Sequence, residues 1–477
     1  MQDMRETAVE IMKKKRIIFG FLIVSLMACN FVTQMIAPPT PTPQPTATLT
    51  ATQTATPSPT LTPTPLVPAY VPPQCVNQAL ATLAPEIALA QSTPEIPSNP
   101  NISQAEQLQV FRDLTHVVEN VYVYPDYNGK DWNEIKARYR SKIEAGLDTE
   151  SFYREMQSMV YELGDEHSDY YSPVDVDASE SELRGENDYV GVGVYGEYNF
   201  ERQSFVVIST FPGSSAEYAG LQAHDSILLV DGLPITEELG NRLRGPECSV
   251  AVARVQSPGE ASRDVMLVRY RIDSGLPLDS RMISTSDGSK IGYIFLPSFF
   301  DETLPPQMEQ ALNQFGELDG LILDLRLNGG GSSTVAYPIM SFFTSGRLGA
   351  FVSREQSRAL EIDADPIHNS QSVPLIVLVS EDTVSFGEIF AGIMQDLGRA
   401  KVVGQTSLGN VEVLNGYDFD DGSMIWIASE TFDSAYSEDN WEQSGIIPDV
   451  EAYAEWDTFY FDTDPAILAS LELLGHQ

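Results

Sequence analysis

The chain has 477 residues, of which 42% are hydrophobic, enough to bury the cores of roughly two to four domains. Its 28 Lys and Arg and 68 Asp and Glu give a formal net charge of −40, which repels phosphate backbones and anionic membrane surfaces. This balance argues against nucleic-acid binding, and the ordinary composition argues against a fibrous or wholly disordered protein. Three cysteines are too few for a disulfide framework, and the sequence leaves open whether Cys75 and Cys248 pair.

The N-terminus has the pattern of an export signal. Basic residues 13–16 precede an apolar run, residues 17–28, that is too short to span a bilayer comfortably. The run ends Leu-Met-Ala-Cys at Cys29, which resembles a bacterial lipobox and implies that Cys29 carries a lipid. The alternative is an ordinary secretory signal with an incidental cysteine. We expect residues 1–28 to be a signal peptide and the protein to lie outside the cytoplasm, lipid-anchored to the cell membrane, or secreted if Cys29 is not modified.

A low-complexity segment follows the signal. Residues 37–68 contain almost only Pro, Thr, Ala and Leu, which cannot form a core and favour extended polyproline II structure. At about 3.1 Å per residue this segment reaches at most roughly 100 Å. We therefore expect residues 29–102 to be a stalk and an irregular linker.

Residues 103–186 are predicted to form an N-terminal helical domain. Apolar residues recur at helical spacing between 104 and 121, and two further helical patterns follow, the last with Thr149 as its N-cap. A polar stretch, residues 164–173, then ends the helical pattern and contains His167.

Residues 187–275 switch to a β pattern with a period of two. A glycine loop precedes a strand, a short helix begins after Pro212-Gly213, and another strand ends at an Asp231-Gly232 turn. This order resembles a PDZ domain. The resemblance implies that a loop binds the C-terminal carboxylate of a peptide while the peptide adds a strand to the sheet. The alternative is a β domain that only packs between its neighbours. The loop residues are Tyr189, Val190, Gly191, Val192 and Gly193.

Residues 276–470 alternate strands and helices, which predicts an α/β core with mostly parallel strands. The continuously apolar run 375–379 is typical of a central strand. A hairpin is predicted to turn at Asp421-Gly422. The fold class expected for the whole chain is therefore α+β and multidomain.

Ser385 is the candidate nucleophile. It lies past the apolar strand at the start of a predicted helix, where Ser385 and Glu388 also fit a capping box that needs no catalytic role. A helix N-terminus offers free N–H groups and a positive dipole to a developing oxyanion. The glycine run 329–331 supplies further amides after a neighbouring strand. We expect the N–H groups of Phe386 and Gly330 to form an oxyanion hole.

The order of these features resembles the carboxyl-terminal processing (tail-specific) protease family. The resemblance covers about residues 104–452 and rests on runs such as LILDLRLNGGG, TVSFGEIFAGIMQDLGRAKVVGQTSLGN and SGIIPDVE. It implies a serine peptidase with a PDZ domain, a crotonase-like α/β core and Ser385 as the nucleophile.

The sequence departs from this family's usual bacterial pattern at one position. Most bacterial members pair the serine with a lysine about 25 residues later and a glutamine four residues further on. Here those positions hold Asn410 and Leu414. An amide nitrogen is not basic, so Asn410 cannot deprotonate a serine. Lys401 is the nearest other lysine, but it lies in a predicted strand.

A second branch, the tricorn core proteases and their relatives, uses Ser, His and Glu. His167 precedes the PDZ-like segment, as in that branch, and Glu442 lies 57 residues after Ser385, close to the branch's spacing of roughly 58. The resemblance implies that His167 takes the serine proton and later protonates the leaving amine, while Glu442 orients the imidazole. Glu430 and Asp433 are the alternatives to Glu442, and His368 is the alternative to His167.

The sequence thus predicts an extracytoplasmic, lipid-anchored serine endopeptidase whose PDZ-like domain recognises the C-termini of protein or peptide substrates. One alternative is a catalytically inactive peptide-binding pseudo-protease, and another is a core that binds a hydrophobic small molecule. No cofactor and no metal is expected. The five histidines are not at helical ligand spacing, and the glycine run lacks the Gly-Lys-Ser/Thr of a phosphate loop.

Overall fold

The computed structural model describes residues 67–76, 98–165, 167–177, 189–199, 202–235, 240–272 and 278–476. They belong to one compact unit, Pro65–Gln477. The predicted signal peptide, Cys29 and residues 37–66 of the stalk lie outside the described residues. Within the described ranges, no helix combines the length and apolar character needed to cross a membrane.

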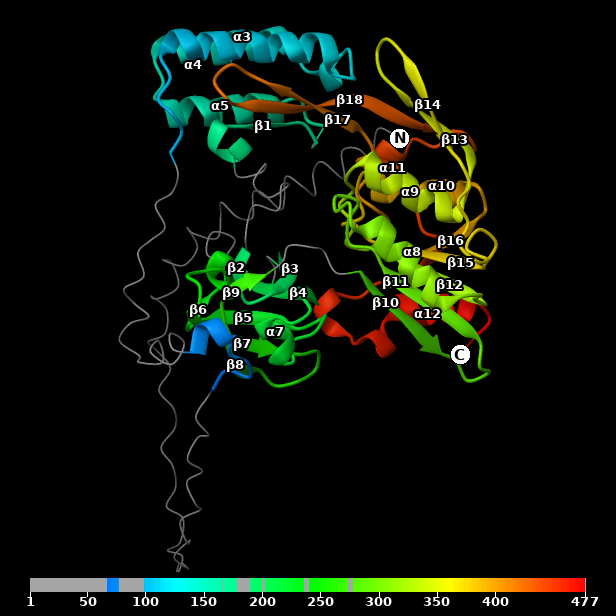
Figure 1. The fold of residues 1–477 in the computed structure, drawn as a ribbon. Coiled ribbons are helices and arrows are strands. Elements are labelled where there is room, and N and C mark those ends of the chain that lie inside the picture. The colour runs from blue at the N-terminus through cyan, green and yellow to red at the C-terminus, as the bar shows by residue number, and fades with distance from the viewer. Residues whose placement is uncertain are drawn as a thin grey trace, which may run out of the picture. The chain divides into compact units, whose positions relative to one another are not determined.

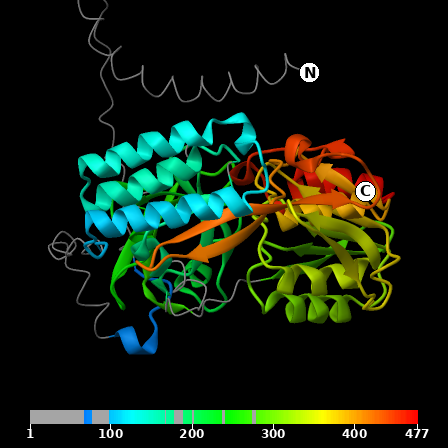
Figure 2. The ribbon, with the colours of Figure 1, turned by 90° about the horizontal axis from the view of Figure 1, so that it is seen from above.

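Three helices lie side by side at the start of the described fold (Figures 1 and 2). They are α3 (Gln104–Val121), α4 (Trp132–Ala145) and α5 (Thr149–Tyr161). Their apolar faces form a buried cluster that includes Leu114 and Met156. The helical pattern read from the sequence is confirmed.

Polar side chains mark where these helices begin. Ser103, Asp131 and Asp148 each accept a hydrogen bond from the N–H three residues later, one of the N–H groups that have no partner inside the helix. The predicted N-cap Thr149 was wrong by one residue, because the Asp148 carboxylate reaches the Ser151 N–H at 2.9 Å.

The helical layer packs on a β hairpin from the C-terminal half of the chain. Strand β17 (Val413–Asp418) pairs antiparallel with the long strand β18 (Met424–Ser434), as the Asp421-Gly422 turn predicts. Ile425 and Ile427 of β18 join the helical cluster. Strand β1 (Asp169–Tyr171), which the sequence did not indicate, pairs with the start of β18 just after His167.

The β domain, residues 189–272, contains one main antiparallel sheet. Its strands, in sheet order, are β3 (Val194–Asn199), β4 (Ser204–Thr210), β5 (Ser226–Val230), β7 (Val250–Gln256) and β8 (Arg263–Val268), with β6 (Leu233–Pro234) paired to β5. Ala251, Ala253 and Val255 of β7 alternate with more exposed residues and are fully buried, as a period of two requires. Strand β3 lies at the sheet edge and pairs with β4 alone among the described strands.

Two shorter features complete the β domain. Strand β2 (Tyr189–Gly191) pairs antiparallel with β9 (Tyr270–Ile272). Helix α7 (Ser215–Tyr218) begins where the Ser214 hydroxyl accepts the Glu217 N–H.

A disulfide joins the end of the linker to the β domain. Cys75, in the short 3-10 helix η2 (Pro73–Cys75), is bonded to Cys248, which settles a pairing that the sequence left open. Cys75 is fully buried, and the ring of Tyr70 stacks on that of Tyr218 with their centroids 4.2 Å apart. The chain that leads into the folded part is thereby fixed to this domain.

The α/β core contains a six-stranded sheet. In sheet order its strands are β10 (Asp279–Ser284), β11 (Lys290–Phe295), β12 (Gly320–Asp324), β15 (Leu375–Val379), β16 (Ala400–Gly404) and β19 (Val450–Glu451). All neighbours are parallel except the β10–β11 pair. The apolar run 375–379 is thus a buried inner strand, as predicted.

Alternate residues of these strands face two different layers. Leu321 and Leu323 of β12 pack into the cluster formed with α8 (Leu304–Phe315), α9 (Ser333–Phe343) and α10 (Phe386–Asp396). Ile322 packs into the opposite cluster with residues of α12 (Pro465–Leu473). Burial on both faces explains why these strands are continuously apolar.

A smaller antiparallel sheet connects the core to the helical layer. Strand β13 (Gly346–Val352) pairs with β14 (Ser357–Ile362) on one side and with the end of β18 on the other. Since the start of β18 packs under the helices, this one strand links the two regions. The molecule is a mixed α/β protein, as predicted.

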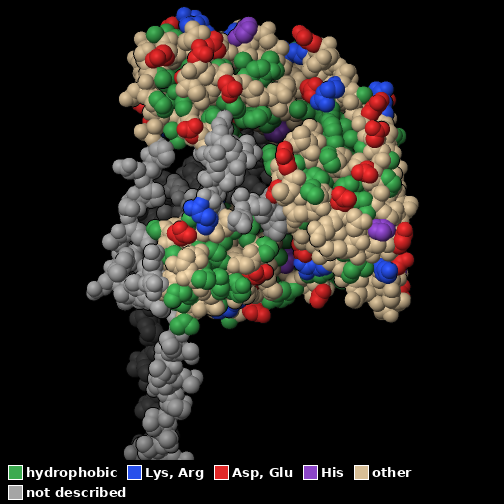
Figure 3. Space-filling model, viewed as in Figure 1, with side chains coloured by type: hydrophobic (Ala, Val, Ile, Leu, Met, Phe, Trp, Pro, Cys, Tyr) green, Lys and Arg blue, Asp and Glu red, His purple; other side chains and the backbone are tan. Residues whose placement is uncertain are grey.

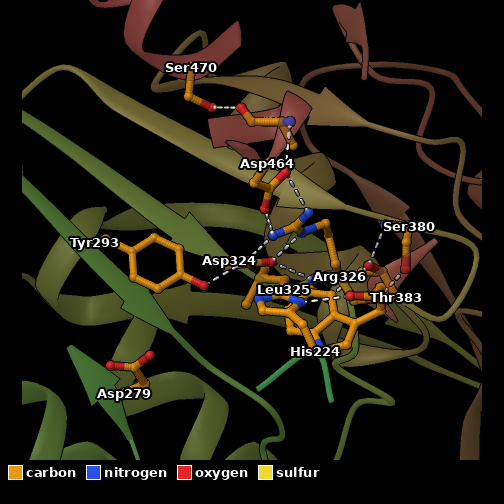
Figure 4. Close-up of polar contacts among 12 residues, drawn as sticks. His224, Asp279, Tyr293, Asp324, Leu325, Arg326, Ser380, Thr383, Asp464 and Ser470 are labelled. Atoms are coloured by element: carbon orange, nitrogen blue, oxygen red, sulfur yellow. Dashed lines mark hydrogen bonds and ion pairs between the residues drawn. The ribbon is translucent and has the colours of Figure 1, made fainter. Parts of the chain in front are cut away.

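A buried ionic network joins the β domain to the core (Figure 4). Arg326 is paired with Asp324 and Asp464, and all three side chains are at most 9% exposed. Nδ1–H of His224 in the β domain donates to the Trp456 carbonyl at 2.7 Å, and Arg326 lies over the Trp456 ring. The network fixes the end of β12, from which the next loop reaches the candidate site.

On the face shown in Figure 3, acidic side chains are spread among other residue types rather than gathered in one patch. On this face the acidic side chains are therefore scattered singly and in small groups.

Candidate active site

Ser385 is held in a strained backbone conformation at the start of α10. Its φ is +56°, a region that residues with a side chain rarely adopt without support from their surroundings. Its N–H donates to the Asn410 carbonyl at 3.0 Å and to Oε2 of Glu388 at 3.2 Å. Strain held by a network of this kind is common where a side chain must be presented to a substrate.

The turn that leads to Ser385 is fastened to the end of β12 (Figure 4). Thr383 is fully buried, donates to the Leu325 carbonyl at 2.8 Å and accepts the Ser380 N–H at 2.9 Å. The Ser380 hydroxyl in turn donates to the Arg326 carbonyl. The turn of Ser385 therefore rests on the same strand end that the Arg326 network fixes.

The glycine loop after β12 lies directly against Ser385. A Cβ built on Gly330 would be 2.6 Å from Cβ of Ser385, and Gly330 has φ +88°, so only glycine fits there. Buried Asn328 organises this loop: its Oδ1 accepts the Gly330 N–H at 2.9 Å, and its carbonyl accepts the Val384 N–H. Of the two predicted oxyanion donors, Gly330 is thus engaged by Asn328, whereas Phe386 N–H has no acceptor among the described residues.

Glu388 fastens a second loop, residues 407–412, to the start of α10. Its carboxylate is fully buried and accepts the Ser407 hydroxyl at 2.6 Å, the Gly409 N–H at 2.7 Å and the Asn410 N–H at 2.8 Å. Burial raises the pKa of Glu388, and these hydrogen bonds oppose that shift. The sequence indicated that Ser385 and Glu388 cap the helix. In the structure, Glu388 also binds the loop that contains Asn410.

The same loop ends beside His167. Nδ1 of His167 lies 3.7 Å from Oε2 of Glu412, whose side chain is 1% exposed. Oε1 of Glu412 accepts the Tyr124 hydroxyl at 2.8 Å. His167 is positioned by the turn before β1, where the Asp165 carboxylate accepts its backbone N–H at 3.1 Å and Ser168 binds the Ala428 N–H. His167 and Ser385 make no hydrogen bond to each other in the described chain.

Glu442 lies on the far side of Glu412. It belongs to the short helix α11 (Trp441–Ser444), and its Oε2 accepts the Val411 N–H at 2.8 Å. Burial and the neighbouring Glu412 carboxylate raise the pKa of Glu442. Burial also acts to raise the pKa of Glu412, but its interactions with His167, Glu442 and Tyr124 outweigh it, and the pKa of Glu412 is lowered.

A cavity of about 330 Å³ opens beside this acidic group. Besides the loop residues Gly409 and Asn410, its lining includes Tyr124, Asp165, Glu412 and Glu442. The cavity adjoins Ser385 through Asn410, whose carbonyl accepts the Ser385 N–H.

Two regions of the chain are similar to known peptidases. Residues 290–452 match the model of peptidase family S41, and residues 103–160 match that of the tricorn protease C1 domain. The chain is a serine peptidase. Residues 290–452 are similar to the core of peptidase family S41, and Ser385 and the glycine loop both fall within the matched residues.

Individual relatives align with most of the length of this peptidase. The carboxyl-terminal-processing protease of Synechocystis sp. is 27% identical over 380 residues, which is 77% of this chain and 87% of the relative. Carboxyl-terminal-processing peptidase 2 of Arabidopsis thaliana chloroplasts is 27% identical over 369 residues, 74% of this chain and 70% of the relative. A solved photosystem II D1 C-terminal processing protease shares the fold, with a TM-score of 0.53 and 24% identity over 73% of this chain and 93% of that one.

The alternative residues of the peptidase lie elsewhere. The Lys401 ammonium is 2.6 Å from Asp449, and its side chain is 63% exposed. His368 is exposed in the connection that enters β15, whereas Ser385 follows the other end of that strand. Glu430 is paired with Arg358 at 2.8 Å, and Asp433 is exposed in β18 opposite Ala350. None of these four has a described contact with Ser385, His167 or Glu412.

The predicted peptide-binding loop of the peptidase is tightly packed in the β domain. Val192 is fully buried, and its N–H donates to the Leu243 carbonyl at 3.2 Å. A Cβ on Gly193, where φ is +84°, would be 2.1 Å from Cβ of Ser214. Tyr189, Val190 and Gly191 form β2 and are paired with β9. The loop therefore leads directly into the edge strand β3.

Sequence reasoning missed Glu412, Tyr124 and the structural role of Asn328. The only sequence signal for Glu412 is an acidic residue two positions after Asn410. In the described ranges, no group of three or more His, Cys, Asp or Glu side chains is arranged to hold a metal ion.

Proposed function

We propose that this serine peptidase is an extracytoplasmic, lipid-anchored endopeptidase that cleaves proteins or peptides by a Ser-His-Glu mechanism. Ser385 is the nucleophile, His167 is the general base, and a glutamate orients His167, the role that the sequence assigns to Glu442. The observation that carries this proposal is the loop 407–412, which binds the Ser385 backbone at Asn410 and contacts His167 through Glu412.

The reaction steps follow from these positions. Ser385 Oγ attacks the scissile carbonyl carbon while His167 takes the hydroxyl proton. The oxyanion accepts a hydrogen bond from the Phe386 N–H. It accepts a second one from the Gly330 N–H, once that group has given up its hydrogen bond to Asn328. His167 then gives its proton to the leaving amine, and water attacks the acyl-enzyme with His167 again as base.

A serine–lysine mechanism has little support in this chain. The position where the family usually has its lysine holds Asn410, whose backbone rather than side chain contacts Ser385. The ammonium of Lys401 is paired with Asp449. A histidine beside a buried carboxylate is the arrangement that remains to activate Ser385.

The β domain, in our proposal, is a PDZ-like domain that recognises the C-terminal tails of substrates. Its edge strand β3 has a free side among the described strands, where a peptide strand can pair. The relatives are named for C-terminal processing, which supports tails as the substrate feature that is recognised. The core would be of the crotonase-like type that the family resemblance implies.

The proposal is tested by digestion of an unfolded protein with the full-length chain. Wild type is compared with Ser385→Ala, His167→Ala and Asn410→Ala. We expect the first two variants to lose about 10⁴- to 10⁶-fold in turnover and Asn410→Ala to keep most activity, because its backbone contacts remain. Retained cleavage in Ser385→Ala contradicts the proposal. If wild type never cleaves but binds peptides, the chain is the peptide-binding pseudo-protease.

A further inference from the structure

The proposed mechanism leaves open which of two buried glutamates acts on His167, and the inference that follows rests on that mechanism. Nδ1 of His167 and Oε2 of Glu412 are both buried, and neither has a hydrogen-bond partner in the described chain. They lie 3.7 Å apart. A buried donor or acceptor without a partner is costly, and a small rotation of the imidazole would let each satisfy the other.

The Glu412 carboxylate is held in a fixed orientation toward the imidazole. Its side chain is 1% exposed, and the Tyr124 hydroxyl binds Oε1 at 2.8 Å. This hydrogen bond leaves Oε2 as the oxygen that faces His167. Hydrogen bonds donated to a carboxylate stabilise its ionised form, so Tyr124 favours a negative charge at Glu412.

Glu442 makes different contacts. Its Oε2 accepts the Val411 N–H at 2.8 Å, and its carboxyl group interacts with that of Glu412. No contact between Glu442 and His167 is present in the described chain. Two carboxyl groups buried together do not readily both ionise, so one of them keeps a proton.

We propose that Glu412, rather than Glu442, is the negatively charged residue that positions His167, and that Glu442 is a neutral carboxylic acid that donates a hydrogen bond to Glu412. Glu412 is thus a positioning residue: it holds the imidazole with Nδ1–H toward Oε2 and stabilises the imidazolium while Ser385 is acylated. Glu442 fixes the Val411 backbone and the Glu412 carboxylate.

The other charged groups nearby are already engaged. The Asp165 carboxylate accepts the backbone N–H groups of His167 and Ser168 and the Ser168 hydroxyl. Glu388 accepts the Ser407 hydroxyl and the backbone N–H groups of Ser385, Gly409 and Asn410. Neither has a described contact with the imidazole, so Glu412 is the acid left to orient it.

Two isosteric substitutions distinguish the glutamates. In Glu412→Gln the negative charge is lost, and we expect kcat for peptide cleavage to fall about 10²- to 10⁴-fold with KM nearly unchanged. In Glu442→Gln a neutral hydrogen-bonding group replaces another, and we expect a loss of kcat at least about tenfold smaller than that in Glu412→Gln. The rate at which a fluorophosphonate labels Ser385 should follow the same order. The result that overturns the inference is a loss in Glu442→Gln equal to or larger than that in Glu412→Gln.

Two further variants keep the test decisive if Glu412→Gln does not fold. Tyr124→Phe removes the hydroxyl that holds Oε1, and we expect kcat to fall several-fold with KM unchanged, whereas the exposed Tyr161→Phe has no effect. Glu412→Asp keeps the charge and should recover part of the activity. If Tyr124→Phe equals its control and Glu442→Gln is impaired, the inference is wrong. Ser385→Ala, run alongside, separates this failure from failure of the proposed function, since only the latter predicts cleavage without Ser385.

Discussion

Asn410 accepts the Ser385 N–H at its carbonyl and donates its own N–H to Glu388, so the residue that stands where the family usually has a lysine acts through its backbone. Two positions later, Glu412 contacts His167. The loop 407–412 therefore connects Ser385, Glu388 and His167. Because Asn410 takes part through its backbone, the absence of a lysine side chain at that position leaves this connection intact.

The close approach of Gly330 to Ser385 predicts that an alanine at position 330 lowers activity much more than an alanine at position 329. Gly330→Ala would place a Cβ 2.6 Å from Cβ of Ser385 at a φ of +88°, so either the loop or the nucleophile must move. We expect at least a 10²-fold loss of kcat/KM, because a shift of about 1 Å at a reacting group has effects of that size. Gly329→Ala, whose Cβ meets nothing within 4 Å, is the matched control and should keep near wild-type activity.

Glu388 should be important for stability as well as for activity. Glu388→Ala leaves the Ser407 hydroxyl and the N–H groups of Gly409 and Asn410 without their acceptor in a buried region. We expect the free energy of unfolding to fall by at least about 3 kcal/mol, measured by urea denaturation. Glu472→Ala, on the exposed side of α12, should change it by less than about 0.5 kcal/mol. Equal effects of the two substitutions would argue against the fastening role of Glu388.

The raised pKa of Glu442 predicts a pH-dependent stability difference. Burial and Glu412 raise the pKa of Glu442 above its ordinary value of 4.5, so the folded protein keeps a proton that the unfolded chain releases. This contribution to stability is fully present below pH 4.5 and is lost as the pH rises toward the folded pKa, by at most about 1.4 kcal/mol per pH unit. Glu442→Gln does not titrate.

Relative to wild type, Glu442→Gln should therefore gain stability progressively between pH 5 and pH 8. The measurement is the free energy of unfolding of both proteins at several pH values. A difference that stays constant with pH, or that favours wild type at high pH, would show that Glu442 is ionised in the folded protein.

The Cys75–Cys248 disulfide predicts that reduction lowers stability through the linker and the β domain, which this bond joins. Cys75→Ser with Cys248→Ser removes a bond between residues 173 positions apart, which in typical proteins stabilises by about 2–4 kcal/mol. We expect thermal unfolding of the double variant to match that of reduced wild type and to lie below that of oxidised wild type. Identical melting of all three proteins would mean that the bond contributes nothing to stability.

Local patterns in the sequence predicted most elements of the fold. The apolar run 375–379 became the buried strand β15, and the Asp421-Gly422 turn formed the β17–β18 hairpin. The position of Ser385 at the start of α10 was also predicted. These features depend on residues close together in the chain, which periodicity and turn chemistry report directly.

The parts that were missed depend on packing between distant segments. Glu412 meets His167 only because β18 brings the hairpin under the helical layer, and no local pattern around residue 412 carries that information. The engagement of Gly330 by Asn328 is likewise a product of the folded loop. The Cys75–Cys248 pair could not be deduced because two cysteines 173 residues apart give no indication of proximity.

Activation of Ser385 by His167 is tested most directly by covalent labelling of the full-length protein with a fluorophosphonate, followed by mass spectrometry of the labelled peptide. We expect a single modification on Ser385, a large loss of labelling rate in His167→Ala and near wild-type labelling in Asn410→Ala and Lys401→Ala. Labelling that persists in His167→Ala but disappears in Lys401→Ala would contradict activation by His167 and would assign it to a lysine.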